Sequence, residues 1–325
     1  MKKYLLFTAF LWISLLLIPL CLNGTKGSAK TNTDEFIMLS DENEGINGDI
    51  IKVYNSENNT AETMDFRDYI IGVVAAEMPA QFHSEALSAC AVAAATLART
   101  KMLSGGDSAL SGAVISTDST KHQAYMDKKE MKERWGEDFN TYYKKICDAV
   151  DNAIDYSITY NGELIVAAYH AISPGVTENS ENIWSEGFPY LTSVDSPGDK
   201  LSPKFSSEKK LSFDEFKEII EAEGTELSDD KALWLGSGEY TDAGTLIKIT
   251  IGNKQFSGEK LRDIFSLRSA AINLSMNKDG IIFSVKGYGH GVGMSQYGAD
   301  YLARQGASWQ EIIKHYYQGV EIEII

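Results

Sequence analysis

The chain has 325 residues, of which 43% are hydrophobic and 23% are charged. This length is sufficient to bury a sizeable core, in one large domain or two small ones. The 46 acidic residues outnumber the 30 basic ones and leave a formal net charge of −16. Because no basic stripe interrupts this acidic balance, the composition argues against nucleic acid as a partner.

The amino-terminal segment has the composition of a membrane anchor. Lys2 and Lys3 precede an uncharged, leucine-rich stretch at 4–25, and about 20 apolar residues suffice to cross a bilayer as a helix. We therefore expect a single-pass membrane protein whose amino terminus is cytoplasmic and whose remainder lies outside. A cleaved signal peptide is the alternative, although its apolar region is usually only about 7–15 residues long. The predicted organisation is a cytoplasmic tip and transmembrane anchor at 1–25, a polar stalk at 26–48 and an extracytoplasmic domain at 49–325.

The extracytoplasmic domain is expected to begin with a strand at 49–54. The apolar run at 66–78 predicts a helix that Pro79 should end. Ser84 is a candidate cap for a second helix at 85–103, which is rich in alanine and leucine, both good helix formers. Since small side chains allow close contact between helices, we expect this alanine-rich helix at the centre of the domain.

The rest of the chain mixes helices and strands. Asn161-Gly162, between two apolar or alternating runs, predicts a hairpin at 157–170. Serine followed three residues later by glutamate predicts helix-capping boxes at Ser212 with Glu215 and at Ser308 with Glu311. Further helices are predicted at 121–131, 137–155, 259–266 and 294–304, and further strands at 113–117, within 245–258, and at 269–275, 281–286 and 320–325. Because these elements do not alternate as βαβ units, the predicted fold class is α+β, with antiparallel or mixed sheets around the alanine-rich helix.

Three cysteines are present: Cys21, Cys90 and Cys147. No two of them are at the Cys-x-x-Cys spacing, and Cys21 falls inside the apolar amino-terminal run. A disulfide framework is therefore not expected. Cys90 and Cys147 are predicted to be small core residues.

Glu77 is the first candidate for chemistry. It ends an apolar helix, and its preceding neighbours at 73–76 are apolar. Burial among apolar groups disfavours a carboxylate and raises its pKa, and the partial negative charge of a helix C-terminus acts in the same direction. A carboxyl that stays protonated near neutral pH is what a general acid at a glycosidic bond requires. On the pattern alone, the alternative is a glutamate that faces water or pairs with a lysine.

Three separate stretches resemble the stage II sporulation protein D family. The first, at 70–100, contains Glu-Met-Pro at 77–79, Glu-Ala-Leu at 85–87 and an alanine-rich helix ending in Ala-Arg-Thr at 98–100. The second, at 169–184, resembles the family's block of Tyr-His, Ser, Gly, Thr and Trp, and the third, at 287–306, resembles its glycine-rich block. One such motif would be weak support, but three in order make the resemblance specific.

The resemblance implies a lytic transglycosylase that cleaves peptide-stripped peptidoglycan glycan strands in septal wall remodelling and engulfment during endospore formation. It implies a cell-wall amidase and other engulfment proteins as partners. Glu77 would be the catalytic acid and base, and the sugar's own 6-hydroxyl would close an anhydro ring, so that a second carboxylate is not needed. Two alternatives remain: a non-catalytic glycan-binding module that enhances a partner amidase, and a glycoside hydrolase with Glu85 or Glu178 as the second carboxylate.

The resemblance also implies a set of glycan-binding residues. Side chains that donate and accept hydrogen bonds suit sugar hydroxyls and acetamido groups. The candidates are His170, Ser173 and Thr177 beyond the hairpin, and Tyr288, His290, Ser295, Gln296 and Tyr297 in the glycine-rich block. The alternatives are ordinary turn residues for Ser173 and Thr177, and core packing for Tyr288 and Tyr297. Pro174 stands where the family commonly has glycine, which predicts a stiffer loop, and Trp184 is expected to be core rather than a sugar platform.

No cofactor and no metal are expected. Some members of the family carry a Cys/His zinc cluster after the alanine-rich helix, but the corresponding segment at 116–125 has His122 and no cysteine. One imidazole cannot complete a four-ligand site, so His122 is predicted to be structural. His83 and His315 are assigned no role.

Overall fold

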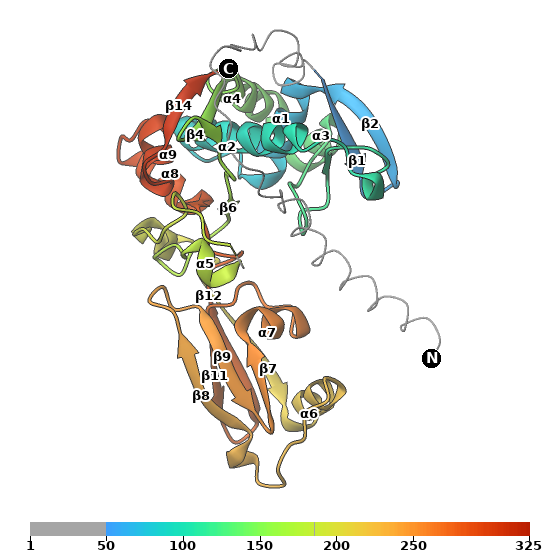
Figure 1. The fold of residues 1–325 in the computed structure, drawn as a ribbon, viewed down its shortest axis with the longest axis vertical. Helices are drawn as coiled ribbons and strands as arrows, with labels where there is room; N and C mark the ends of the chain where they lie inside the picture. The colour runs from blue at the N-terminus through green and yellow to red at the C-terminus, as the bar shows by residue number, and fades with distance from the viewer. Residues whose placement is uncertain (1–49, 185) are drawn as a thin grey trace, which may run out of the picture. The chain divides into compact units, whose positions relative to one another are not determined.

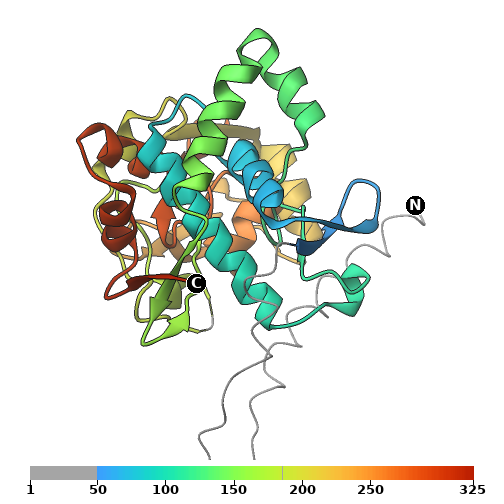
Figure 2. The ribbon, with the colours of Figure 1, turned by 90° about the horizontal axis from the view of Figure 1, so that it is seen from above.

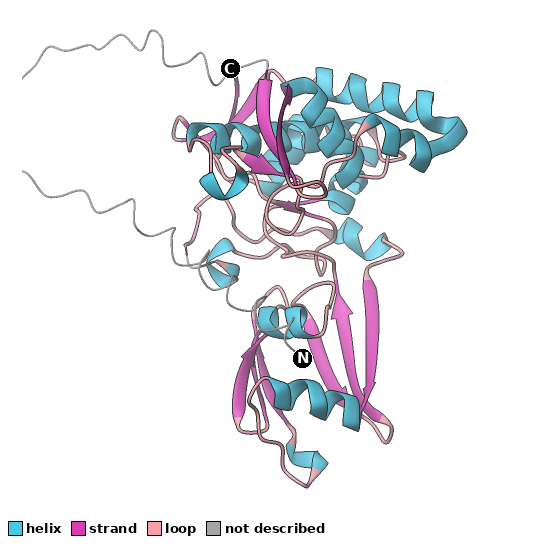
Figure 3. Cartoon of the chain, turned by 90° about the vertical axis from the view of Figure 1, so that its right-hand side faces the viewer, coloured by secondary structure: helices cyan, strands magenta, loops and turns pink. Residues whose placement is uncertain are grey.

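The computed structural model describes residues 50–184 and 186–325. The predicted anchor and stalk, together with Cys21, lie outside these residues. The described chain combines helices with five small sheets, as Figures 1 and 3 show. The predicted α+β class is therefore confirmed, whereas the transmembrane helix stays a prediction.

The alanine-rich helix α2 (Ser84–Leu103) is the centre of the larger hydrophobic core. Residues 89–95 are fully buried, which confirms the expected central position. Four helices pack against it, and Figure 2 shows several of them around it: α1 (Phe66–Glu77), α4 (Phe139–Asp151), α8 (Gln296–Arg304) and α9 (Trp309–Tyr316). Among the described helices, α2 alone is long and apolar enough to cross a membrane, but most of its surface is buried inside the protein.

The beginning of α2 differs from the prediction. His83 is the capping residue, because its Nδ1 accepts the N–H of Glu85 at 3.3 Å, and Ser84 is already the first helical residue. The N–H of His83 is itself fixed by Asp300 Oδ1 at 2.6 Å. This tertiary contact holds the extended backbone that a capping position needs.

The first sheet has the strand order β2-β1-β3. Strand β1 (Ile50–Asn55) confirms the strand expected at 49–54, and it pairs antiparallel with β2 (Thr60–Asp65) and parallel with β3 (Ile115–Ser116). The helix expected at 121–131 is wrong in its first half, since α3 spans Lys128–Trp135. The preceding segment is held extended by the N–H of Met126, which donates to the carbonyl of Gly72 in α1 at 3.1 Å.

The predicted hairpin is present, but it is shorter than expected. Strands β4 (Tyr156–Tyr160) and β5 (Glu163–Leu164) meet at Asn161 and Gly162, both at positive φ. Strand β6 (Tyr169–His170) belongs to another sheet, where it pairs in parallel with β13 (Met294–Ser295). The closing strand β14 (Glu321–Ile324) pairs antiparallel with β4.

A second hydrophobic core lies within residues 206–285. It is enclosed by two three-stranded sheets, of order β10-β9-β8 and β11-β12-β7, and its centre includes the stacked rings of Phe216 and Phe265. Its elements are β7 (Ser206–Ser212), α6 (Phe213–Ala222), β8 (Leu235–Tyr240), β9 (Leu246–Ile251), β10 (Lys254–Ser257), α7 (Gly258–Ile264), β11 (Ile272–Met276) and β12 (Gly280–Lys286). Both predicted capping boxes are confirmed, at the starts of α6 and α9.

The remaining elements are short. They are α5 (Ser180–Ile183) and the 3-10 turns η3 (Ser108–Leu110), η4 (Gly136–Asp138), η5 (Pro197–Leu201) and η6 (Lys231–Leu233). Cys90 is buried and Cys147 is partly buried, and both are free thiols, in agreement with the prediction of small core residues.

Gly293, directly before β13, lies close to the backbone of Ala168. Its φ is +72°, and a Cβ there would collide with the carbonyl oxygen of Ala168. Replacing Gly293 by Ala should therefore lower the free energy of unfolding by about 3 kcal/mol in denaturant titrations, from backbone strain and overpacking together. Gly306→Ala is the matched control, because Gly306 also has a positive φ, of +98°, but faces open space; it should cost only about 1 kcal/mol. Equal losses in both variants would contradict the packing argument.

Candidate functional site

Glu77 lies at the carboxyl end of α1, with its side chain held between two N–H donors. Oε1 accepts the N–H of Ala124 at 2.9 Å, and Oε2 accepts Nε2 of Gln296 at 3.1 Å. The residue is partly buried. Since each carboxylate oxygen has two lone pairs, both oxygens retain acceptor capacity beyond these contacts.

Burial raises the pKa of Glu77 above its usual value, and the hydrogen bonds from Ala124 and Gln296 act in the opposite direction. Loss of hydration disfavours the charged form, whereas N–H donors favour it. The burial and the upward pKa shift expected from the sequence are both present. The carboxyl is thus protonated more readily than an exposed glutamate, yet its ionised form is provided with donors.

The surroundings of Glu77 are polar but uncharged. The hydroxyl of Tyr69 donates to Gln123 Oε1 at 3.0 Å, and Gln123 Nε2 donates to the hydroxyl of Tyr169 at 2.9 Å. Burial and the charge of Glu77 both raise the pKa of each tyrosine. Both phenols therefore remain neutral, and among these three side chains only the pKa of Glu77 starts from the acidic range and is raised from there.

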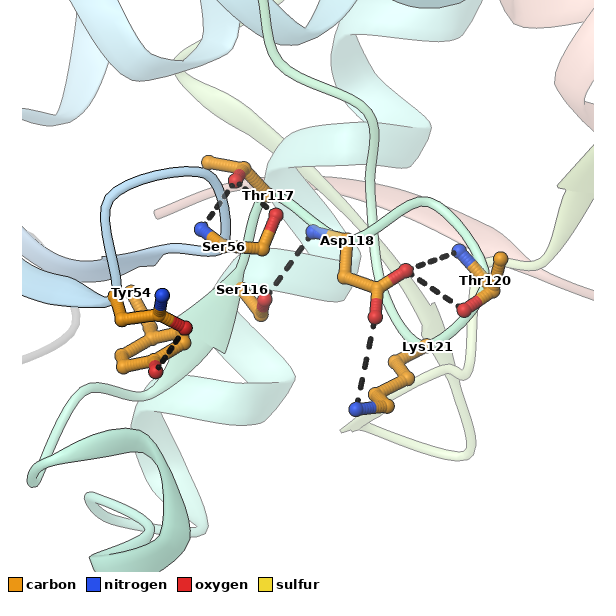
Figure 4. Close-up of polar contacts among 8 residues, drawn as sticks. Tyr54, Ser56, Ser116, Thr117, Asp118, Thr120 and Lys121 are labelled. Atoms are coloured by element: carbon orange, nitrogen blue, oxygen red, sulfur yellow. Dashed lines mark hydrogen bonds and ion pairs between the residues drawn. The ribbon is translucent and has the colours of Figure 1, made fainter. Parts of the chain in front are cut away.

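A tight polar turn delivers Ala124 to Glu77. Asp118 Oδ1 accepts the N–H and the hydroxyl of Thr120, at 3.0 and 2.7 Å, and the N–H of Asp118 donates to Ser116 Oγ at 3.1 Å, as Figure 4 shows. The hydrogen bonds from Thr120, and then the charge of Lys121, hold the pKa of Asp118 below its usual range. The hydroxyl of Thr117 meanwhile accepts the N–H of Ser56 at 3.0 Å and so attaches the turn to the end of β1.

This turn occupies the segment in which the resemblance placed a zinc cluster in some relatives. Within the residues that the structure describes, no group of three or more His, Cys, Asp or Glu side chains is arranged to hold a metal ion. Burial lowers the pKa of His122, so His122 is neutral, in keeping with the structural role predicted for it.

The glycine-rich block folds back onto residues 169–178. Tyr288 exchanges two backbone hydrogen bonds with Ile172, at 2.7 and 3.0 Å, and the N–H of Glu178 donates to the carbonyl of Gly291 at 2.8 Å. A Cβ on Gly289 would press against the side chain of His170. Two of the three motifs noted in the sequence therefore form one layer of backbone, and Gln296 extends from it to the Glu77 of the first motif.

The predicted glycan-binding residues divide into accessible and interior ones. Tyr288 is 45% exposed, and the guanidinium of Arg268 lies 5.8 Å from its ring centroid. His290 and Tyr297 are partly buried, with the Tyr297 ring packed edge-on against Phe82. The others are buried: His170, Ser173, Thr177, Ser295 and Gln296.

The two histidines form a neutral pair. His170 Nδ1 lies 3.0 Å from the carbonyl oxygen of Val292, and His290 Nδ1 accepts the N–H of the same residue at 3.1 Å. Burial lowers their pKa values, to about 4 for His170 and about 3 for His290. Trp184 is partly buried and packs against the His290 ring and the larger core, so its role as a core residue rather than a sugar platform stays a prediction.

The interior hydroxyls bind protein groups. Ser173 Oγ donates to Asp199 Oδ2 at 2.5 Å, and Ser295 Oγ donates to Asp199 Oδ1 at 2.5 Å. Thr177 Oγ1 accepts the N–H of Val194 at 2.9 Å. Asp199 is not among the residues predicted from the sequence, because it follows Ser-Pro-Gly and has the appearance of an ordinary turn residue.

Comparison with known proteins identifies the family. Residues 54–160 match the family model described as Stage II sporulation protein, SpoIID. Stage II sporulation protein D of Bacillus subtilis (strain 168) is 39% identical over 272 residues, which cover 84% of this chain and 78% of that protein. The chain belongs to the stage II sporulation protein D family. The resemblance seen in the three motifs is thereby confirmed.

Other members and relatives of the family match over similar lengths of this chain. Stage II sporulation protein D of Bacillus amyloliquefaciens is 38% identical over 84% of this chain and 78% of that protein. The protein named Amidase enhancer of Bacillus subtilis (strain 168) is 29% identical over 77% of this chain, but over only 40% of its own length.

Two further carboxylates near the family's motifs are engaged by the protein. Glu85 Oε2 accepts the N–H of Trp309 at 2.7 Å and so connects α2 to α9. Glu178 is buried, and its two oxygens accept Asn182 Nδ2 at 2.7 Å and the Thr241 hydroxyl at 2.6 Å. Both side chains are thus occupied by structural contacts.

A surface depression of about 450 Å³ lies along α4. It is lined by Ser84, Asn140, Thr141, Lys144, Lys145 and Asp148. None of these residues is among the predicted catalytic and glycan-binding residues. The depression is therefore not assigned to the chemistry of Glu77.

The raised pKa of Glu77 predicts how stability depends on pH. The pKa of Glu77 in the folded state lies above its value in the unfolded state, which is about 4.3. The folded state therefore loses stability as the pH rises through the window between these two pKa values. Glutamine does not ionise and escapes this loss. The difference in free energy of unfolding between Glu77→Gln and the parent should therefore be constant below the window and increase in favour of the variant across it, measured by urea titration at a series of pH values.

The control for this measurement is Glu133→Gln, which removes an exposed carboxylate from α3. A difference for Glu77→Gln that follows the control at every pH would show that the Glu77 pKa is not raised.

Proposed function

We propose that this protein is a lytic transglycosylase of peptidoglycan glycan strands, with Glu77 as its catalytic acid and base. The observation that carries the proposal is the partly buried carboxyl of Glu77, with its pKa raised by burial and its oxygens oriented by Ala124 and Gln296. A carboxyl with a raised pKa and N–H donors for its ionised form can both donate and recover a proton. Its place in the Glu-Met-Pro motif of the family supports the same role.

The reaction needs one proton carrier. Protonated Glu77 gives its proton to the bridging oxygen, and the bond from that oxygen to C1 of the sugar breaks. The N–H groups of Ala124 and Gln296 then stabilise the carboxylate that remains, because they favour its charged form. This carboxylate takes the proton of the sugar's 6-hydroxyl while that oxygen bonds to C1. The products are an anhydro sugar and a free hydroxyl, and Glu77 is again protonated.

The setting of this activity is inferred from relatives. Two relatives are named stage II sporulation protein D and one is named amidase enhancer. We infer a role in septal wall remodelling during endospore formation, on glycan from which a cell-wall amidase has removed the peptides. The protein is held at the membrane by the segment at 4–25, with the residues from 49 onward outside the cytoplasm and other engulfment proteins as partners.

Glu77→Gln should abolish cleavage while glycan binding is kept, because glutamine preserves the side-chain shape but cannot carry the proton. The measurement is mass spectrometry of products from purified peptide-free glycan strands, with co-sedimentation as the binding readout. Glu133→Gln, on the exposed face of α3, should cleave as the parent does. Anhydro-sugar products from the Glu77→Gln variant would remove Glu77 from the mechanism.

The same products decide between the lytic route and plain hydrolysis. In water labelled with ¹⁸O, the lytic route leaves the new sugar end unlabelled, since no water attacks C1. Hydrolysis by Glu77 with a second carboxylate would put the label there.

The match to an amidase enhancer supports a second candidate function. In that case the domain binds glycan and increases the activity of a partner amidase, and Glu77 has only a structural task. Purified protein incubated with glycan strands in the absence of any amidase separates the two functions. Cleavage products support the enzyme, and increased release of peptides only when amidase is present supports the enhancer.

Tyr288 is the predicted contact that is most available to a sugar. Its ring is 45% exposed and lies beside Arg268, and aromatic faces stack on the apolar faces of sugar rings. Tyr288→Ala should weaken glycan binding about fivefold, which corresponds to about 1 kcal/mol, and Tyr288→Phe should bind as the parent does. Isothermal titration with glycan oligomers in the Glu77→Gln background measures this without turnover. Unchanged affinity in Tyr288→Ala would exclude the stacking contact.

A further inference from the structure

Asp199 is a carboxylate buried where three segments of the chain meet. It lies in η5 and is fully buried. Oδ2 accepts the hydroxyl and the N–H of Ser173, at 2.5 and 3.0 Å, and Oδ1 accepts the hydroxyl of Ser295 at 2.5 Å. Each oxygen thus holds a different segment: one holds the loop after β6, and the other holds the junction of β13 with α8.

The Ser295 end of this cluster leads directly to Glu77. Ser295 caps α8, since its Oγ also accepts the N–H of Gly298 at 3.2 Å. Gln296, the next residue, is only 4% exposed, and its Nε2 donates to Glu77 Oε2 at 3.1 Å. The backbone conformation at Ser295 therefore determines where the side-chain amide of Gln296 points.

The first turn of α8 has no room to adjust independently. A Cβ on Gly298 would meet Ser196 Oγ and the Tyr316 hydroxyl, which are hydrogen-bonded to each other at 2.8 Å. Gly198, beside Asp199, is packed equally closely against Tyr301 of α8. Because the helix is confined on these sides, a change at Asp199 is transmitted to Gln296 rather than absorbed by a loop.

We propose that Asp199 is a positioning residue for Glu77, which acts through Ser295 and Gln296. It touches neither the carboxyl of Glu77 nor the scissile bond. Its two oxygens fix the cap of α8 so that the Gln296 amide remains on Glu77 Oε2. The proposal deepens the proposed function, and it assigns to Asp199, Ser173 and Ser295 a shared task inside the protein.

An asparagine at position 199 cannot accept the same three hydrogen bonds. Asp199 accepts three hydrogen bonds with two oxygens, whereas an amide offers one acceptor oxygen and one NH₂ group. One of the two serine hydroxyls would then face a donor. In the orientation that turns the NH₂ group towards Ser295, the Ser295 hydroxyl can only accept from the amide and its own proton loses the Oδ1 acceptor, so the anchor of the α8 cap is weakened.

The decisive experiment measures the pKa of Glu77 by ¹³C NMR titration of side-chain-labelled protein, which requires no catalytic activity. Removing the Gln296 donor should raise the Glu77 pKa, because that hydrogen bond favours the carboxylate. Asp199→Asn should raise it in the same direction as Gln296→Ala. The double variant should show no larger shift than Gln296→Ala alone, since both changes remove one contact.

The other titratable groups around Glu77 are Tyr69 on α1, Cys90 on α2 and Tyr169 on β6. None of them is altered in these variants, so a shared shift reports the Gln296 contact. The matched control is Asp195→Asn, which changes an exposed carboxylate in the same loop and should leave the Glu77 pKa unchanged.

Activity gives the second readout. Asp199→Asn should lower the cleavage rate about tenfold with little change in the affinity for glycan, as expected for a misplaced catalytic group, and the alkaline limb of its pH–rate profile should move up with the Glu77 pKa. If Asp199→Asn does not fold, Ser295→Ala provides the same test, since it removes the Oδ1 contact together with the α8 cap that the same hydroxyl forms with Gly298. An unchanged Glu77 pKa in a folded Asp199→Asn or Ser295→Ala variant would overturn the positioning role, whether or not the parent cleaves glycan. A parent without cleavage, but with the expected pKa shifts, would instead remove the proposed enzyme and keep the positioning role.

Discussion

The structure depends on a carboxyl group that the fold removes from water and then supplies with donors. Burial at the end of α1 raises the pKa of Glu77, while the N–H groups of Ala124 and Gln296 limit that rise. Either effect alone would be of little use to an acid–base catalyst, because burial without donors prevents ionisation, and donors without burial prevent protonation. The balance is structural in origin, since the two donors come from positions 47 and 219 residues away in the chain.

The rest of the fold holds these donors in place. The fully buried middle of α2 lets α1 and α8 approach from different sides, and the turn around Asp118 directs the following segment to Glu77. On the other side, the glycine-rich block lies flat against residues 169–178, and β13 leads into α8. The family's three motifs are therefore not three separate binding loops. One provides the carboxyl, and the other two form the layer from which the Gln296 amide reaches it.

Much of this could be predicted from the sequence, and the failures have physical causes. Helices with apolar faces and capping boxes were identified correctly, because their signals are local. Strands β2 and β7 were missed because most of their side chains are polar and exposed or partly buried. The segment at 121–127 looks helical in composition, but a hydrogen bond to α1 holds it extended. Glu77 could be found from its apolar neighbours, whereas Asp199 could not, since its partners lie 26 and 96 residues away.

The segment containing the second core is joined to the rest of the chain in a way that bears on its history. It begins after Phe205 and ends before Gly287, and the N–H of Gly287 donates to the carbonyl of Phe205 at 2.8 Å. The two ends of the segment are thus hydrogen-bonded neighbours, and the 81 residues between them form an insertion that starts and finishes at the same place. An insertion of this kind can be lengthened, shortened or exchanged during evolution without altering the path of the backbone on either side of it. The path of the chain that carries Glu77 therefore does not depend on how long this segment is.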